Sequence, residues 1–318
     1  MKPLVSVITL TYKNYDKLYE TIKSVLVQDY SNIEYIISDD ASGDFPRDEV
    51  ESFIKENNKN GIKYKIIVND NNLGTVKNFN NAIKNTNGDY IFPLSGNDIF
   101  FNESVVTDIV KMFLESKCQM VITSRVNYFE NRTTCVYPHI KDIKYIMQMN
   151  NNLKKYKALM LSEHYGMFIG CNMYYDRNAL EKYGLFDEKY RLLEDLPILE
   201  KFMWYEKVDL KPGFYSIYHD AKTGVTLRRH SAHPLLQKDI NLYNRSNRMG
   251  HYNELDHKTR DHIDFGIERT KVKNGVQLAF ICLRHVPRII SYLCYCFRER
   301  IIWKSDKKVL SRMDNSFL

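Results

Sequence analysis

Oxygen-bearing side chains gather directly after an apolar run that ends at residue 94. The run 90–94 is typical of a buried strand, and Ser95, Asn97 and Asp98 follow it around Gly96, which allows a tight exit. A carboxylate at the carboxyl end of a strand lies where open α/β sheets bind ligands. Its oxygens suit a hard cation such as Mg²⁺ or Mn²⁺, bound together with the phosphates of a nucleotide. Because Asp98 is the only acid of the cluster, we expect the protein alone to hold such a metal weakly.

Strands and helices alternate through the first half of the chain and would position this cluster. Apolar, β-branched runs predict strands over 4–10, 33–38, 64–68, 89–94 and 119–125. Helical spacing of apolar residues predicts helices over 16–28, 47–57, 75–84 and 103–116. Strands joined by crossover helices indicate an α/β fold with a Rossmann-like, mainly parallel sheet flanked by helices. No G-x-G-x-x-G follows the first strand, which argues against a dinucleotide oxidoreductase.

The pattern changes after residue 125. It weakens from 126 to 175, and then predicts helices over 176–183 and 194–205 and an aromatic strand over 214–218. Beyond about residue 220 the sequence predicts helices over 233–250 and 256–304, with Pro287 kinking or breaking the last one. We therefore divide the chain into an α/β unit, residues 1–221, and a basic helical C-terminal region, residues 222–318.

Charge is unevenly distributed along the 318 residues, whose net charge is +7. Residues 222–318 hold 19 Lys and Arg against 9 Asp and Glu, whereas residues 1–221 hold 27 against 30. An anionic partner is therefore expected at the C-terminal region. Six cysteines without a C-x-x-C pair indicate a reducing compartment, and no apolar run reaches the roughly 20 residues of a membrane span. Because the N-terminus leads straight into a strand, we also expect no signal peptide.

Four motifs follow one another in order along residues 4–205. They are Val-Ser-Val-Ile-Thr-Leu-Thr-Tyr at 5–12, Ser-Val-Leu-Val-Gln at 24–28 with Ile-Ile-Ser-Asp-Asp-Ala-Ser at 36–42, Asn-Leu-Gly at 72–74 leading to Asp98, and Glu194-Asp195 eight residues after Phe-Asp-Glu at 186–188. In this order they resemble the GT-A glycosyltransferases of family 2. The resemblance does not extend to the C-terminal third.

The resemblance implies a GT-A catalytic domain over residues 1–221. Its nucleotide-sugar half would cover about residues 1–125 and its acceptor half about 126–221. It also implies an inverting, metal-dependent transfer of a sugar from a nucleotide diphosphate sugar, a UDP-sugar. The acceptor would be a glycan or lipid-linked glycan in the synthesis of a bacterial surface polysaccharide such as a capsule.

The resemblance places five residues at the nucleotide: Leu10, Tyr12, Asp40, Lys77 and Asn97. Asp40 would accept the imide N–H of uracil, and Tyr12 would stack on the base. Lys77 would contact the diphosphate at a helix N-terminus, and Asn97 replaces an acid that usually contacts the ribose. Simpler roles stay open, because Asp40 precedes a predicted helix that it could cap, Tyr12 could pack in its loop, and Lys77 could be a solvated surface residue.

The same resemblance makes Asp195 the general base that takes the proton of the acceptor hydroxyl. Three residues would line the acceptor and sugar pocket: Glu194, Gly170 and Cys171. Asp98, with His219, would hold Mn²⁺ or Mg²⁺. Asp195 could instead only stabilise the helix that it begins, and His219 could be structural. The replacement of acids by Ser95 and Asn97 leaves a second function open, a sugar-nucleotide-binding protein without transferase activity.

Residues 275–303 alternate apolar clusters with Arg284, Arg288, Arg298 and Arg300. Such a segment suits the interface of an anionic membrane, with its apolar face down and its arginines at the lipid headgroups. The alternative is a pair of helices packed on the α/β unit or on the second copy of a homodimer. We expect a cytoplasmic protein, peripheral on the inner face of the cell membrane. Nucleic-acid binding is not expected, because no recognised module accompanies the charge.

Overall fold

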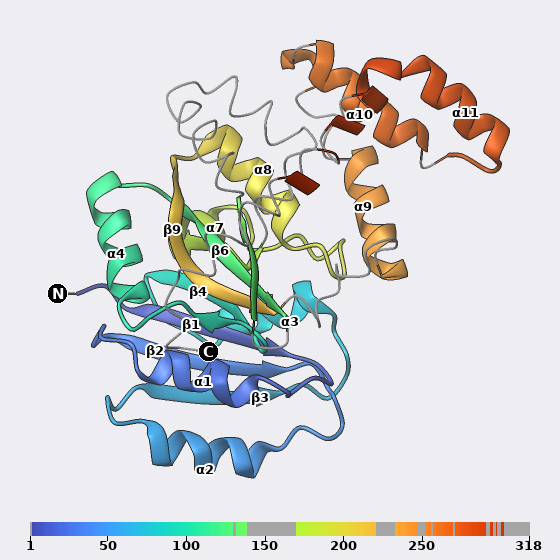
Figure 1. Ribbon diagram of the computed structural model, residues 1–318. Coiled ribbons are helices and arrows are strands. Elements are labelled where there is room, and N and C mark those ends of the chain that lie inside the picture. The colour runs from blue at the N-terminus through green and yellow to red at the C-terminus, as the bar shows by residue number, and fades with distance from the viewer. Residues whose placement is uncertain are drawn as a thin grey trace.

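The computed structural model describes residues 2–129, 132–138, 170–220, 233–246, 252–255, 257–269 and 271–290, together with 293, 294, 297, 300 and 301. Within these residues one curved sheet forms the centre, and helices lie on both of its faces (Figure 1). Most of the weakly patterned stretch 126–175, and part of the predicted 275–303 segment, lie outside the described residues. No helix in the described part of the chain is both long and apolar enough to cross a membrane.

The sheet contains nine described strands. They are β1 (Val5–Thr11), β2 (Ile33–Asp39), β3 (Lys63–Val68), β4 (Tyr90–Ser95), β5 (Ile99–Phe100), β6 (Met120–Phe129), β7 (Arg132–Tyr137), β8 (Met173–Asp176) and β9 (Val208–Asp220). Their order is β3-β2-β1-β4-β8-β6-β9-β5, and β7 pairs with β6 outside this path. The strands β3, β2, β1 and β4 are parallel, whereas β8 runs antiparallel to both of its neighbours.

The described helices connect and cover these strands. They are α1 (Leu18–Leu26), α2 (Arg47–Asn57), α3 (Thr75–Lys84), α4 (Val105–Ser116), α7 (Arg177–Lys182), α8 (Asp195–Tyr205), α9 (Pro234–Ser246), α10 (His257–Arg269) and α11 (Gly275–Arg284), with short 3₁₀ turns at Gly170–Asn172 and Tyr252–Glu254. The predicted α/β fold with crossover helices between parallel strands is confirmed. The parallel strands β3, β2, β1 and β4 all lie within residues 5–95; among the later strands β6 and β9 are parallel, and the remaining pairings are antiparallel.

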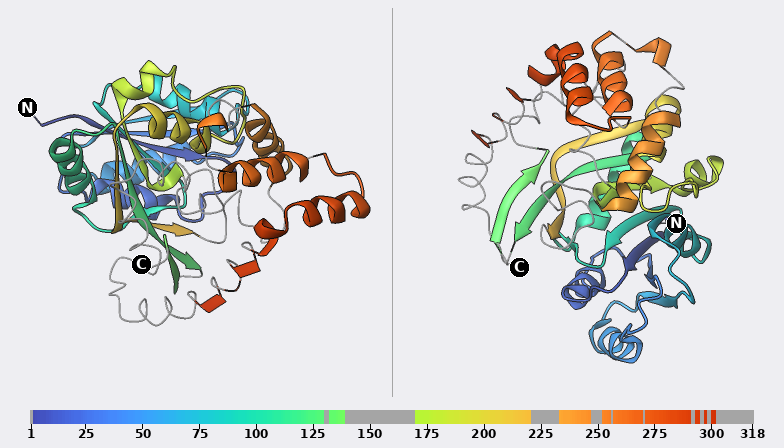
Figure 2. Two further views of the ribbon diagram at one scale, coloured as in Figure 1. Left: turned by 90° about the horizontal axis from the view of Figure 1, so that it is seen from above. Right: turned by 90° about the vertical axis from the view of Figure 1, so that its right-hand side faces the viewer.

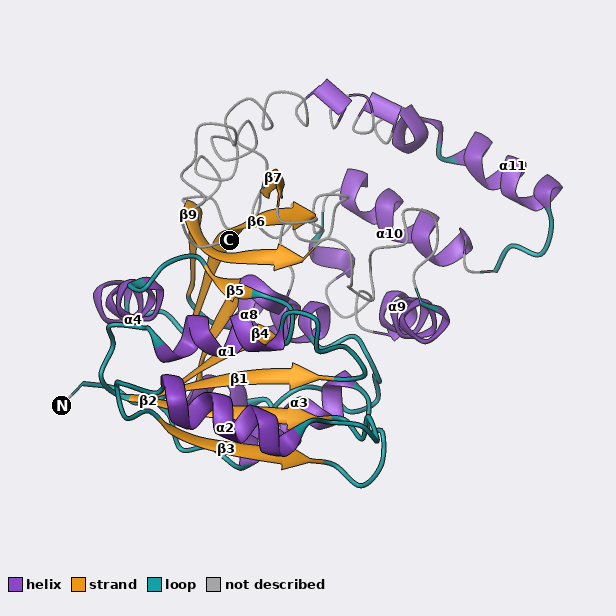
Figure 3. Ribbon diagram, turned by 60° about the horizontal axis from the view of Figure 1, so that its bottom comes forward, coloured by secondary structure: helices purple, strands orange, loops and turns teal. Residues whose placement is uncertain are grey.

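Both faces of β1, β2 and β4 are largely buried, which explains why these strands are mostly apolar, whereas the edge strand β3 is partly exposed and carries two lysines. Val7 of β1 belongs to the core shared with α1, α2 and α4, and its neighbour Ile8 belongs to the core shared with α3 and α8. The strands β1, β2 and β3 point the same way, so the loops that follow them lie along one edge of the sheet (Figure 3). Ligand-binding residues are expected along this edge.

The first described helix after residue 220, α9, packs into the core of the α/β unit. Leu236 and Tyr243 of α9 are buried in the same core as α3 and α8. The Tyr243 hydroxyl also donates a hydrogen bond to Glu200 of α8, at 2.9 Å. Helices α10 and α11 follow as an outer pair, side by side beyond the end of the sheet (Figure 2).

Candidate active site

Asp98 and His219 lie next to each other although 121 residues separate them in the sequence. The turn after β4 ends at Asp98, and β5 then pairs antiparallel with β9, so that Ile99 lies opposite Tyr218. This pairing brings Nδ1 of His219 to 2.8 Å from Oδ1 of Asp98. Cys171 joins them, and the three possible ligand atoms lie within 4.8 Å of one another. The two residues predicted for the metal therefore meet, and a residue predicted for the sugar pocket lies beside them.

Two buried oxygens near this cluster lack a hydrogen-bond partner within the described part of the chain. They are Oδ2 of Asp98 and Oδ1 of Asn97. Asp98 is only 1% exposed, and burying an unpaired carboxylate oxygen is costly. A cation or a ligand hydroxyl would relieve this cost. These two atoms therefore fit a site that is completed by a bound group.

The donor atoms indicate which metal fits. A carboxylate suits Mg²⁺ or Mn²⁺, whereas an imidazole favours a transition metal such as Mn²⁺ over Mg²⁺, whose ligands are oxygens. Burial, followed by the negative charge of Asp98, raises the pKa of the Cys171 thiol well above its usual value. Asp98, His219 and Cys171 thus present a set of donor atoms that fits a divalent cation.

Glu194 and Asp195, the acidic pair, lie where α8 begins. Both contact the short turn Gly170–Asn172. Asp195 accepts hydrogen bonds from the backbone N–H of Gly170, at 3.2 Å, and of Leu196, at 2.7 Å. A Cβ atom at position 170 would lie 2.7 Å from Oε1 of Glu194, so glycine permits this close approach. The predicted residues Gly170, Cys171, Glu194 and Asp195 are therefore brought together.

Helix α9 holds the loop that leads into this pair. Asp239 of α9 accepts the backbone N–H groups of Arg191, at 2.8 Å, and Leu192, at 2.6 Å. Asp239 is 5% exposed, so these bonds are shielded from water. Arg191 in turn accepts the N–H of Val76, at the start of α3, through its carbonyl oxygen, at 3.2 Å. The acidic pair is thereby tied to both α3 and α9.

The carboxylate of Asp40 holds the backbone of a neighbouring loop in this structure. This carboxylate accepts the N–H groups of Leu73, at 2.7 Å, and Gly74, at 2.8 Å, and so fixes the loop before α3. Its neighbour Asp39 is fully buried, and accepts from the side chain and the backbone of Ser42. The simpler role that the sequence left open for Asp40, capping the helix that follows it, is not present, because α2 has Pro46 at its N-cap; Asp40 holds the loop before α3 instead.

The other residues predicted for the nucleotide lie on or near the same edge of the sheet. Tyr12 follows β1 and is 46% exposed, with the Lys13 ammonium 5.3 Å from the centre of its ring. Leu10 accepts the N–H of Gly96 at 3.0 Å, which holds the turn that carries Asn97 and Asp98 beside β1. Lys77 is exposed in the first turn of α3. Tyr12 and Lys77 are thus accessible to a ligand.

Comparison with known sequences decides the family. The profile of the family described as Glycosyl transferase family 2 matches residues 6–184, more than half of the chain. The chain belongs to this family. The match covers β1 through α7, including Asp40, Asp98 and the turn at Gly170.

Curated relatives and solved structures agree with this assignment. An uncharacterized glycosyltransferase of Rickettsia typhi is 25% identical over 70% of this chain, which spans 66% of that relative's length. A putative teichuronic acid biosynthesis glycosyltransferase of Bacillus subtilis, TuaG, is 30% identical over 38% of this chain and 46% of its own.

Two solved structures share the GT-A fold. Staphylococcus aureus TarS (residues 1–349), crystallised with UDP-GlcNAc, has a TM-score of 0.58 at 16% identity, covering 84% of this chain and 71% of its own. The mannosyltransferase PcManGT of Pyrobaculum calidifontis, in complex with GDP-Man and Mn²⁺, has a TM-score of 0.55 at 14% identity, covering 98% and 85%.

This family 2 chain also carries a buried cation that the motifs did not reveal. Arg125 of β6 is 6% exposed, and its Nε atom donates to Asn127 at 3.1 Å. Its guanidinium lies 4.7 Å from the centre of the Tyr137 ring, and its Nη1 atom is buried with no hydrogen-bond partner in the described residues. The positive charge acts on Cys171 and Asp195. The sequence feature that could have indicated this buried cation is a charged residue in the middle of an otherwise largely apolar strand.

The two acids differ in the groups that surround them. Although both residues keep some exposed surface, burial dominates and raises the pKa of Glu194 and of Asp195. For Glu194 the charge of Asp195 adds to this rise. For Asp195 the N–H groups of Leu196 and Gly170 and the charge of Arg125 oppose it. Asp195 is therefore the member of the pair that is favoured as a carboxylate.

We expect Glu194→Gln to flatten the pH dependence of stability. With a raised pKa, folded Glu194 keeps its proton where the unfolded chain has lost it, so its contribution favours folding at low pH and is lost as pH rises through the raised value. Urea unfolding of both proteins from about pH 5 to about pH 8 checks this. An identical pH slope in the two proteins would contradict the raised pKa.

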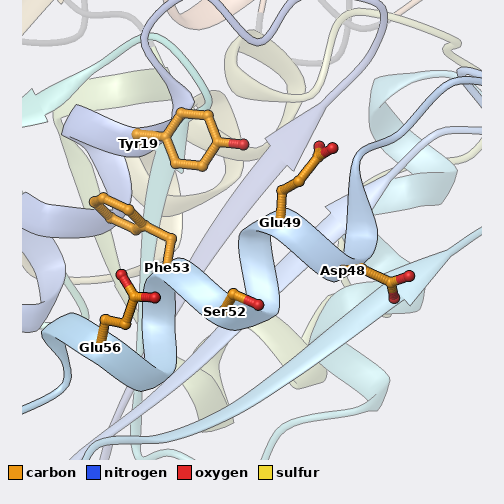
Figure 4. Close-up of a pocket in the computed structure, with 6 residues that line it drawn as sticks. All are labelled: Tyr19, Asp48, Glu49, Ser52, Phe53 and Glu56. Carbon is orange, nitrogen blue, oxygen red and sulfur yellow. The ribbon is translucent and has the colours of Figure 1, made fainter.

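A separate depression lies between α1 and α2, with a volume of about 430 Å³ (Figure 4). Six side chains line it: Tyr19, Asp48, Glu49, Ser52, Phe53 and Glu56. None of them belongs to the metal cluster or the acidic pair. Its three carboxylates would repel a nucleotide diphosphate, so this depression does not compete with the site around Asp98.

Proposed function

We propose that this chain is an inverting glycosyltransferase that moves a sugar from a nucleotide diphosphate sugar, a UDP-sugar, to a glycan or lipid-linked glycan. The observation that carries the proposal is that two chemistries meet at one short turn. Gly170 of the turn donates to the carboxylate of Asp195, and Cys171 of the same turn lies beside the Asp98–His219 pair. A sugar between them would have a base on its acceptor side and cation ligands on its leaving-group side.

In this mechanism the acceptor hydroxyl attacks the anomeric carbon from the face opposite the diphosphate. The bond from the acceptor oxygen to the anomeric carbon forms while the bond from that carbon to the phosphate oxygen breaks. Asp195 takes the hydroxyl proton as the new bond forms. Mn²⁺ held by Asp98 and His219 would supply stabilisation of the negative charge on the departing diphosphate.

Several residues support a nucleotide at the edge of the sheet. The oxygens of Asp40 keep lone pairs beyond those used by Leu73 and Gly74, so the carboxylate can still accept an imide N–H. Tyr12 presents an exposed ring for stacking, and Lys77 an exposed ammonium for phosphate. The complexes of TarS with UDP-GlcNAc and of PcManGT with GDP-Man and Mn²⁺ favour this class of donor.

The relative TuaG is a putative teichuronic acid biosynthesis glycosyltransferase, and this similarity favours a surface polysaccharide as the product. A lipid-linked acceptor would place the enzyme at the inner face of the cell membrane, as a peripheral cytoplasmic protein.

We expect Mn²⁺ and UDP together to stabilise the folded protein much more than either alone. A single protein carboxylate holds the metal weakly, and the diphosphate supplies the missing oxygens. At free ligand about 100 times its Kd, binding adds about 2.7 kcal/mol to the free energy of unfolding. Thermal unfolding with UDP, Mn²⁺, both or neither checks this. Equal shifts with UDP in EDTA and in Mn²⁺ would contradict metal-assisted binding.

Ser95 and Asn97 favour one competing function, a protein that binds a sugar nucleotide without transferring the sugar. Both replace acids that the family's motif usually carries at these positions, so the acidic motif is reduced to Asp98. Release of UDP from a panel of UDP-sugars, with candidate acceptors and Mn²⁺, separates the two functions. Binding without turnover across the panel would favour the competing function.

A further inference from the structure

The end of α11 and the residues that follow it contact α10. His285, directly after α11, is 3% exposed and lies between two carboxylates of α10, with Nδ1 2.6 Å from Asp261 and Nε2 3.4 Å from Glu268. Arg284 forms an ion pair with the same Glu268 at 3.0 Å. The guanidinium of Arg288 lies 4.7 Å from the centre of the Phe265 ring. Charged groups thus supply contacts between this segment and α10, while Ile281 and Cys282 are the half-buried residues of α11 itself.

The opposite side of this segment is apolar and exposed. The exposed fractions are 67% for Val276, 70% for Phe280, 70% for Leu283, 56% for Ile290, 60% for Leu293 and 68% for Phe297. The spacings of three, four and seven residues are those of one helical face, and the backbone is helical on both sides of His285. A helix of a water-soluble protein normally turns such a face toward its core. Here the polar contacts with α10 hold that face outward.

The charge of residues 275–303 indicates which kind of partner would bind the apolar face. Residues 275–303 contain four arginines and one acid, Glu299, and Lys271 and Lys273 precede them. A second copy of the chain would bring the same positive charge to the same face. An anionic lipid surface would bring the opposite charge together with an apolar layer. Cations beside an apolar helical face are typical of helices that lie in a membrane interface.

We propose that the apolar face formed by Val276, Phe280, Leu283, Ile290, Leu293 and Phe297 docks on an anionic lipid bilayer, lying in the plane of its headgroups. These six side chains would enter the boundary between headgroups and acyl chains, and the exposed Lys271, Lys273 and Arg300 would contact the phosphates. The contacts of His285 and Arg284 with α10 would fix the orientation of the catalytic unit above the surface. This surface is independent of the proposed transfer chemistry.

The test is flotation of the full chain with vesicles of phosphatidylcholine, with and without phosphatidylglycerol. We expect the protein to float with the vesicles that contain phosphatidylglycerol, and less so at high salt. The double variant Phe280→Glu/Leu283→Glu should partition at least about tenfold less, the factor expected from losing the burial of even one such side chain. Leu114→Glu is the matched control, because Leu114 of α4 is 54% exposed and lies on another element. It should float as the unaltered protein does.

Two outcomes would overturn the proposal. One is equal flotation of the unaltered protein and the double variant. The other is a dimer, seen by light scattering without lipid, that the double variant converts to a monomer, since a second copy would then cover the apolar face. A thermal shift with UDP and Mn²⁺ that persists in the double variant shows that its fold is intact. It also separates failure of lipid docking from failure of the proposed transferase function.

Discussion

Asp195→Asn is expected to lower kcat for sugar transfer by about 10²–10⁴-fold, the usual contribution of a positioned general base. The amide has the shape of the carboxylate, but it cannot take the proton of the acceptor hydroxyl. Gly170 and Leu196 donate to different oxygens of the carboxylate, so the single amide oxygen of the variant keeps only one of these two bonds. The residues proposed for the nucleotide and the metal lie on other elements, so donor binding should change little. Initial rates of UDP release with acceptor, and the thermal shift with UDP and Mn²⁺, measure the two effects separately.

Asp187→Asn is the matched control for this variant. Asp187 lies eight residues before Asp195 and pairs with Lys189 at 3.0 Å, in an exposed contact of the kind that contributes little to stability. Its loss should leave the transfer rate within about twofold. If Asp195→Asn retained full activity, the base would have to be another group, and Asp195 would serve only the start of α8.

Asp98→Ala is expected to abolish measurable transfer, with a loss of at least about 10²-fold, because a metal contributes several kcal/mol to charge stabilisation at the diphosphate. The substitution also removes the buried oxygen that has no partner and the acceptor of the His219 contact. Mn²⁺ should then no longer increase the affinity for UDP. Calorimetric titration with UDP, with Mn²⁺ and in EDTA, measures this increase directly.

Ser95→Ala is the control on the same turn, and it should keep both activity and the effect of Mn²⁺. Ser95 is exposed at the end of β4, whereas Asp98 is buried. Equal losses in the two variants would mean that the turn as a whole, and not the carboxylate, supports transfer. Retention of the Mn²⁺ effect in Asp98→Ala would move the metal to another set of ligands.

Local pattern was sufficient to predict the parallel half of the fold. The runs around Val7 and Ile37 are apolar on both faces, and the helices between them show clear helical spacing, because both signals arise within a few residues of chain. The two-residue strand β5 and the four-residue strand β8 were not predicted, because such short strands carry no periodicity of their own. Pairing with β9 and β4 makes them strands.

The site was predictable where motifs carry the information, and not where contacts between distant segments decide it. The meeting of Asp98 with His219 depends on the pairing of β5 with β9, which no local pattern encodes. The environment of Arg125 depends on Asn127, Tyr137 and the acidic pair, which converge only in the folded chain. The anchoring role of Asp40 likewise needs the loop at Leu73 and Gly74, which lies far away in the sequence.

The hydrogen bonds of Asp239 limit how segments of this protein can be exchanged with those of its relatives. The family profile ends at residue 184, and both the loop at Arg191 and Leu192 and the carboxylate of α9 that holds it lie beyond the matched part. The carbonyl of Arg191 also accepts the N–H of Val76, inside the matched part. Residues 6–184 are therefore not a self-contained unit in this protein. A chimera that takes its C-terminal helices from a relative should keep the position of Asp195 only if the donor helix also offers an acceptor at the position of Asp239.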